Sequence, residues 1–222
     1  MYTIYPDWIL RVYHDSIINL SVICPVECAH FNVDFCDISL LNIDYVPPKI
    51  WRFLPAGDEL VDIMGSRDLD SALTKRELDA VHEWLMSNKS FHAMRDHPLH
   101  SVPMLGGMWG FRPSINRSFS KEFLNKIRNK GLIRRYDKRG DQTFLSDQIW
   151  PHIHNDVIAH DSFLCQTWYG KNSRPYPTRR QPVNETNCFI GGVRGCCGSN
   201  GAPFQECPQA CRPKEHLEWI YC

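Results

Sequence analysis

Apolar positions in the first third of the chain occur in short runs separated by turn-forming residues. Runs of this length that are rich in β-branched and aromatic residues are typical of strands. The pair Pro47-Pro48 breaks the pattern, and a brief helix is expected just after it, at residues 50–54. The pattern therefore predicts strands at residues 8–13, 17–24, 31–35 and 61–64.

A helical spacing follows the last of these runs. Thr74 can cap the first turn, and Glu77, three residues later, can reach back to it in a capping box. Leu78, Val81 and Leu85 then fall on one face of the helix. This segment is the clearest helix that the sequence predicts.

Two more helices are expected further along the chain. One spans residues 120–130, with Gly131 as its left-handed cap, and the other begins after Asp141 and stops near Pro151. Strands and helices alternate up to about Cys165, which predicts an α/β sandwich with a mixed, mostly parallel sheet for residues 1–165.

Residues 166–222 differ in composition, because Pro, Gly and Cys dominate and no periodicity persists. We expect a loop-rich tail that is stapled by disulfides. The alternative is a zinc site, but the closely spaced pairs Cys24/Cys28 and Cys207/Cys211 are not followed by a pair of histidines. Six of the ten cysteines lie in the tail: Cys188, Cys196, Cys197, Cys207, Cys211 and Cys222.

Net charge and targeting signals limit the classes of partner and the cellular locations that the sequence supports. The 25 basic and 25 acidic residues balance, so the chain has no overall attraction to nucleic acid or to an anionic membrane. The sequence shows no transmembrane segment and no signal peptide. Oxidised cysteines imply the secretory pathway, either the Golgi lumen or secretion, so we expect a targeting signal before residue 1. Sequons that would suit this setting begin at Asn19, Asn88, Asn116 and Asn184.

Asp68 and Asp70 follow a short apolar run and precede the capped helix. In an open α/β sheet this position is the edge at which ligands bind. Two carboxylates one residue apart can both address a hard divalent cation such as Mg²⁺ or Mn²⁺, which can bridge to a diphosphate. The alternative is structural, with Asp68 paired to Arg67 and Asp70 preceding a turn.

Several motifs extend this stretch into a family resemblance. Arg67-Asp68-Leu69-Asp70-Ser71, Met94-Arg95-Asp96-His97-Pro98 and Gly106-Gly107-Met108-Trp109-Gly110 resemble a group of proteins similar to nucleotide-sugar glycosyltransferases of the GT-A type. The resemblance covers most of residues 5–165 and implies a metal-dependent transferase. Its partners would be a nucleotide-sugar donor and a glycan or protein acceptor, with Mn²⁺ or Mg²⁺ at Asp68 and Asp70 and phosphate near Arg67.

The same resemblance suggests roles for later residues. His160 would be a further metal ligand, and Asp141-Gln142 is similar to a pair that retaining members place near the donor sugar. Structural alternatives are a core or surface histidine for His160 and a helix N-cap for Asp141. The segment Gly106-Gly107 with Trp109 would offer close backbone approach and an aromatic platform to a sugar, although a glycine turn beside a buried tryptophan accounts for the same residues.

Two charged segments leave other functions open. Residues 92–100 contain three histidines, and this density also occurs in dinuclear metal-dependent phosphoester hydrolases. In a transferase, Arg95 and Asp96 of this segment would contact sugar hydroxyls. The basic residues between Lys121 and Arg139 would gather an anionic acceptor or a nucleotide, or would form a solvated helix face.

The resemblance begins close to residue 5, whereas GT-A folds normally open with a strand and loop that hold the nucleotide base. We therefore expect that this first nucleotide-binding unit precedes Met1. Without it the donor would bind weakly, which makes a non-catalytic secreted glycan-binding protein a third hypothesis.

Overall fold

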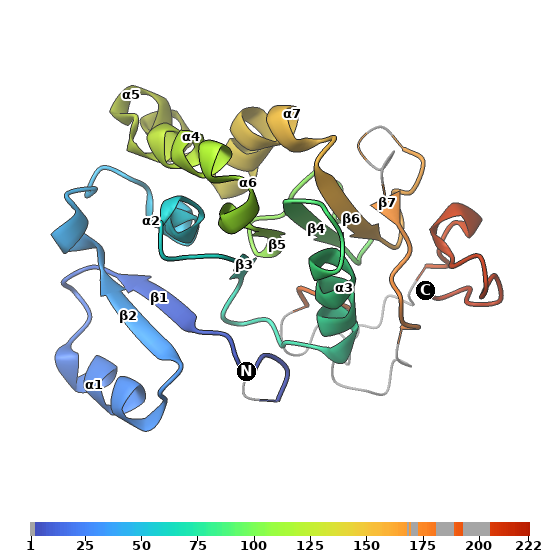
Figure 1. Cartoon of the computed structure of the whole chain (residues 1–222), viewed down its shortest axis with the longest axis horizontal. Helices are drawn as coiled ribbons and strands as arrows, with labels where there is room; N and C mark the ends of the chain where they lie inside the picture. The colour runs from blue at the N-terminus through green and yellow to red at the C-terminus, as the bar shows by residue number, and fades with distance from the viewer. Residues whose placement is uncertain (1–2, 168, 170–172, 181–188, 193–204) are drawn as a thin grey trace.

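The computed structural model describes residues 3–167, 169, 173–180, 189–192 and 205–222. Within these ranges the chain is α/β, with a mixed five-stranded sheet and a separate two-stranded parallel sheet (Figure 1). The prediction of an α/β fold with a mixed sheet is confirmed.

The larger sheet has one strand that opposes the direction of the others. Its strands are β3 (Met64–Arg67), β4 (Phe91–Arg95), β5 (Met108–Phe111), β6 (Val157–Asp161) and β7 (Ser173–Arg174). In the spatial order β3-β5-β4-β6-β7, β5 is antiparallel to both of its neighbours, while β4, β6 and β7 pair in parallel. The residues that follow β3 and β4 therefore emerge at the same edge of the sheet.

The smaller sheet is a β-α-β unit at the start of the chain. It contains β1 (Leu10–His14), α1 (Leu20–Ala29) and β2 (Val33–Asp37). The strand expected at residues 17–24 is wrong, because Asn19 caps α1 by accepting a hydrogen bond from Ser21 N at 2.9 Å. Short runs of β-branched residues do not separate strand from helix. Helix α1 buries only Ile23 and exposes the free thiols of Cys24 and Cys28.

Helices cover both faces of the larger sheet, with α4 to α7 on one side and α3 on the other (Figure 1). A short helix, α2, precedes β3. The helices are α2 (Pro48–Trp51), α3 (Lys75–Leu85), α4 (Arg117–Arg128), α5 (Lys130–Ile133), α6 (Asp141–Phe144) and α7 (Trp150–Ile153), and a π-helical turn, Leu145–Ile149, joins the last two.

Helix α3 begins where the sequence predicts it. The Thr74 side chain accepts a hydrogen bond from Glu77 N at 3.1 Å. Helix α4 starts earlier than expected, capped by Asn116, and ends at Arg128. Gly131 is not its left-handed cap but lies inside α5, because Asn129 ends α4 and caps α5.

An aromatic core fills the space between the sheet and the layer of α4 to α7. Phe53, Trp109, Phe123 and Phe144 are all at most 1% exposed, and Trp109 stacks on Phe123 with ring centroids 5.7 Å apart. Burying a side chain of this size contributes about 1.5–3 kcal/mol to folding. This core holds β5, and the glycines before it, against the helical layer.

The described part of the tail is attached to the domain by a strand and one disulfide, and a second disulfide closes a loop within the tail. Strand β7 pairs with β6, and the disulfides join Cys165 to Cys211 and Cys207 to Cys222. Disulfides of this kind weakly indicate an extracellular or secretory location. No helix among the described residues is long and apolar enough to cross a membrane. Four residues singled out in the sequence lie outside the described ranges: Asn184, Cys188, Cys196 and Cys197.

Candidate functional site

Two of the predicted site residues, Asp68 and Asp141, meet at one arginine. Asp68 follows β3, and Asp141 begins α6. Arg52, at the end of α2, donates a short hydrogen bond from Nη1 to Asp68 Oδ1, and its Nε lies 3.9 Å from Asp141 Oδ2. One guanidinium thus balances two carboxylates that are distant in the sequence.

The Gly106-Gly107 segment lies directly against these carboxylates. A Cβ atom on Gly106 would lie 2.1 Å from Asp141 Oδ2, and a Cβ atom on Gly107 would lie 2.2 Å from Asp68 Oδ2. Such distances are well inside van der Waals contact, so only glycine lets the backbone approach both side chains. The structure therefore brings together four residues that the sequence singled out.

A cleft of about 1230 Å³ opens beside this cluster. It lies between β1 and β3 and is bordered by Arg52, Asp68 and Asp70. Its aromatic lining is provided by Trp8, Trp51, Trp84 and Trp109. Aromatic faces beside charged groups are suited to a ligand that has both apolar rings and phosphates.

Trp109 contributes an unsatisfied donor to this lining. The residue is 1% exposed, and its Nε1 has no hydrogen-bond partner among the described residues. A buried indole N–H usually finds an acceptor, so this unpaired donor is an exception within the core of the described chain.

Asp70 and Gln142 are both exposed. Asp70 borders the cleft, and Gln142 lies in the first turn of α6. The backbone N–H of Gln142 donates to Asp141 Oδ1 at 2.9 Å, which helps to fix the Asp141 carboxylate. The Asp141 side chain thus closes a local turn and also faces Arg52.

Arg67 contacts the glycine segment of the site and helix α3. Its Nη1 donates to Gly107 O at 2.9 Å, and its Nε pairs with Glu77 at 2.9 Å. Glu77 also accepts a hydrogen bond from Tyr5, at 3.4 Å, a contact that the capping pattern did not predict. Burial raises the pKa of the Glu77 carboxyl, although the Arg67 charge opposes the shift. The Arg67 guanidinium therefore supports the loop that carries Gly107.

His160 has a different environment from the one expected of a metal ligand. It is fully buried on β6, its Nδ1 lies 2.8 Å from Nε2 of His92, and its Nε2 lies 3.0 Å from Oε2 of Glu83. Both ring nitrogens are engaged in hydrogen bonds, and burial lowers the pKa of the imidazole, which favours its neutral form. His160 thus joins β6 to β4 and α3, apart from Asp68 and Asp70.

Asp96 is the centre of a buried ion cluster rather than a group facing the cleft. Arg76 Nη2 donates to its Oδ1 at 3.0 Å, Arg180 Nη2 donates to the same oxygen at 2.7 Å, and Ser162 Oγ donates at 2.6 Å. Ile190 N donates to Oδ2 at 3.0 Å. Burial alone would raise the pKa of this carboxyl, but the two guanidinium groups outweigh burial and lower it.

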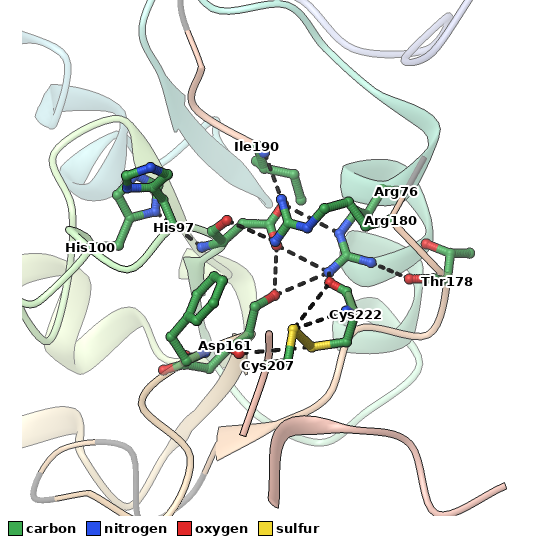
Figure 2. Close-up of polar contacts among 12 residues, drawn as sticks. Arg76, His97, His100, Asp161, Thr178, Arg180, Ile190, Cys207 and Cys222 are labelled. Atoms are coloured by element: carbon green, nitrogen blue, oxygen red, sulfur yellow. Dashed lines mark hydrogen bonds and ion pairs between the residues drawn. A yellow bond between two sulfur atoms is a disulfide. The ribbon is translucent and has the colours of Figure 1, made fainter. Parts of the chain in front are cut away.

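The arginines of this cluster connect the tail to the domain. Figure 2 shows Arg76 and Arg180 side by side, with Thr178 and Cys222 next to Arg76. Arg76 donates to the carbonyl of Cys222 at 2.7 Å and, through a shorter hydrogen bond, to that of Thr178. Asp96 therefore organises contacts that hold the tail, and this gives it a structural role.

Arg95 is likewise committed to the interior. It is 1% exposed, its Nε donates to Asp161 Oδ2 at 2.5 Å, and its Nη1 and Nη2 donate to Pro103 O and Ser173 Oγ at 2.6 and 2.8 Å. With these donors in use, Arg95 links β4 to β6 and β7.

One group of potential metal ligands is assembled in the described part of the chain. Asp161, Cys165 and Cys211 offer ligand atoms within 4.8 Å of one another, and all three are buried. This group could bind a metal ion, whose identity is not indicated. Cys165 and Cys211 are joined in a disulfide, so a metal ion would require their reduction to thiolates.

Arg52 is the site residue that sequence reasoning missed. It lies in a short helix after Pro47-Pro48, and no local pattern distinguishes it from a solvated arginine. Its contacts with Asp68 and Asp141 depend on the tertiary fold.

Comparison of the chain with protein-family models, with curated proteins and with solved structures found no match.

Proposed function

We propose that the chain is a metal-dependent glycosyltransferase that binds the diphosphate of a nucleotide-sugar donor beside Asp68 and Asp141. The observation that carries this proposal is the convergence of both carboxylates and Arg52 on the backbone of Gly106 and Gly107. The cleft beside them has the volume and the aromatic lining that a nucleotide sugar needs.

Asp68 and Asp70 fit a hard divalent cation, because they offer carboxylate oxygens at the solvent-accessible border of the cleft. Mn²⁺ or Mg²⁺ held there would supply positive charge to the leaving diphosphate. The nearby Arg52 guanidinium is suited to pairing with phosphate oxygens, since its planar donors match them in geometry.

The remaining cleft residues would orient the donor. Trp8 and Trp51 offer aromatic faces to a sugar or a base. Gly106 and Gly107 keep the backbone close to the carboxylates. The chain's task in this reaction is mainly positioning and charge neutralisation.

A phosphoester hydrolase centred on residues 92–100 has less support. Asp96 is surrounded by two arginines, and Nδ1 of His100 accepts a hydrogen bond from Asp96 N at 3.0 Å. His92 is hydrogen-bonded to His160. These contacts leave the cluster poorly arranged for two metal ions.

Calorimetry with nucleoside diphosphates tests the donor site. Binding of at least one of UDP, GDP and CDP is expected in the presence of Mn²⁺ and should weaken without it. No heat with any of the three would contradict the proposal. Release of the nucleoside diphosphate from nucleotide sugars, lost in Asp68→Asn and kept in the exposed control Asp44→Asn, would separate a transferase from a glycan-binding protein.

The variant Gly107→Ala tests the geometry of the site. The added methyl group would displace the Asp68 carboxylate, so diphosphate affinity in Mn²⁺ should fall by about tenfold or more, the loss of roughly one charge-assisted contact. Stability should change little, because the displaced atoms belong to one short side chain. The control Gly131→Ala, whose nearest neighbour is Asn129 Oδ1 at 3.6 Å, should keep full affinity. Equal affinity in both variants would contradict the assigned role of Gly107.

A further inference from the structure

A concentrated positive surface lies on the segment between α4 and α6. We define this basic surface by its six cationic side chains, Arg128, Lys130, Arg134, Arg135, Lys138 and Arg139, which are all exposed. Asp137 is the single acidic residue within residues 128–139. Since the whole chain carries 25 basic and 25 acidic residues, this surface is a local concentration of charge.

The core fixes the direction in which these side chains point. Ile133 and Tyr136, one helical turn apart, are 0% and 3% exposed and belong to the aromatic core. Gln148 Nε2 donates to Tyr136 Oη at 2.8 Å and so anchors the turn. Arg134 and Arg135 lie between these two anchors and therefore project into solvent.

Much of this charge is not neutralised within the molecule. Arg139 pairs with Asp147 at 3.2 Å. For Arg134, Arg135 and Lys138, no carboxylate lies within 4.0 Å among the residues that the structure describes. Clustered like charges repel each other, and an anionic partner relieves this repulsion.

The basic surface leads directly into the candidate site. Its last residue, Arg139, is followed by Gly140 and Asp141, and the Asp141 carboxylate lies against Gly106 and faces Arg52. Figure 1 shows α5 at the outer end of the helical layer and α6 near the middle of the molecule. A chain-like ligand bound along this segment would therefore extend towards the cleft.

We propose that the basic surface binds the acceptor, and that this acceptor is an acidic oligosaccharide bearing carboxylate or sulfate groups. The assignment as acceptor rests on the proposed transferase function, whereas the binding of a polyanion does not. A membrane fits less well, because the apolar side chains of the segment, Leu132, Ile133 and Tyr136, are partly or fully buried and cannot insert. Single-stranded nucleic acid fits less well, because Tyr136, the one aromatic residue within residues 128–139, is 3% exposed and its ring is not available for stacking.

Titration with a heparin-derived hexasaccharide tests this surface, with uncharged maltohexaose as the reference ligand. The unmodified protein should bind the sulfated ligand and show no binding of maltohexaose. The triple variant Arg134→Glu, Arg135→Glu, Lys138→Glu should lose about tenfold or more in affinity, since three attractive charges become repulsive. A control with the same charge change at exposed sites elsewhere, Lys75→Glu, Arg179→Glu, Lys214→Glu, should lose no more than about twofold, because distant exposed charges are screened.

Other outcomes would overturn the proposal. Equal losses of hexasaccharide affinity in both triple variants would show that the ligand responds to the net charge of the protein and not to the basic surface. Tighter binding to phosphatidylserine vesicles or to single-stranded DNA than to the hexasaccharide would assign the surface to another partner. Binding of UDP, GDP and CDP with Mn²⁺ should be the same in the triple variant and the unmodified protein. Hexasaccharide binding without any diphosphate binding would refute the donor site and leave the polyanion surface in place.

Discussion

Asp96 shows how much a single buried carboxylate can organise. It accepts hydrogen bonds from Arg76 of α3, from Ser162 just after β6 and from Ile190 of the tail. Removing it would take a buried carboxylate partner away from both Arg76 and Arg180. The sequence places Asp96 in a segment dense in ionisable residues, where a catalytic and a structural carboxylate look the same.

We predict that Asp96→Asn destabilises the fold by about 3–5 kcal/mol, the cost of breaking a buried ion pair by removing one partner. The pKa of the Asp96 carboxyl is lowered in the folded chain, so its stabilisation is present above the unfolded value of about 3.9 and is lost as the pH falls through the folded value. Urea unfolding at a series of pH values checks both points. The difference between the two proteins should shrink below about pH 4.

The matched control for this prediction is Asp62→Asn, because Asp62 pairs with Arg117 at 3.0 Å on the surface and its side chain is 76% exposed. This substitution should cost less than about 1 kcal/mol. An equal loss of unfolding free energy in Asp96→Asn and Asp62→Asn would contradict the prediction that the buried Asp96 ion pairs stabilise the fold more than a surface pair does.

At the scale of the elements, Gly140 sets the position of Asp141. It precedes α6 with φ +83° and ψ 171°, a conformation that is essentially restricted to glycine. No atom lies within 4 Å of a Cβ built at this position, so a substitution there introduces backbone strain without a steric clash.

We predict that Gly140→Ala destabilises the protein by about 1–3 kcal/mol. Chemical denaturation measures the loss. Gly131→Ala is the control, because Gly131 lies in α5 and its φ is not positive, so that alanine there should be neutral or slightly stabilising. If both variants were equally stable, the Gly140 conformation would not be a constraint on the fold.

The elements also show what could be predicted from the sequence and why the rest could not. The start of α3 was predictable, because Thr74 caps it through a local hydrogen bond. The run at residues 17–24 predicts a strand where the structure has α1, since its β-branched residues fit either element and only the Asn19 cap separates the two. At the site, Asp68, Asp141 and Gly106 could each be named as candidates from local motifs. Arg52 could not, because only the tertiary fold brings it to Asp68 and Asp141.

At the scale of the whole molecule, the tail is joined to the domain by one disulfide as well as by the Asp96 cluster, and a second disulfide closes a loop within the tail. The disulfide between Cys207 and Cys222 closes a loop with a sequence separation of 15, and the one between Cys165 and Cys211 spans 46 residues. Both lie beside the carboxyl end of β6. The tail is thereby a part of the domain's packing.

We predict that replacing Cys207 and Cys222 with serine lowers the free energy of unfolding by about 2–4 kcal/mol, because the unfolded chain gains freedom when the loop opens. Thermal unfolding of the oxidised proteins measures this loss. The control, Cys24→Ser with Cys28→Ser, removes two exposed free thiols and should leave the melting temperature unchanged. Equal melting temperatures for all three proteins would show that the disulfide adds no stability.

The separation of the two sheets has a mechanical consequence for the cleft. Within the described residues, the β-α-β unit and the five-stranded sheet share no strand pairing, and the cleft lies along the border between them. Arg11 connects the two sides, since it pairs with Asp34 of β2 and with Asp58 ahead of β3, both at 2.8 Å. The width of the cleft therefore depends on how the β-α-β unit is held beside the larger sheet, and the ion pair between Arg11 and Asp58 is one contact that holds it there.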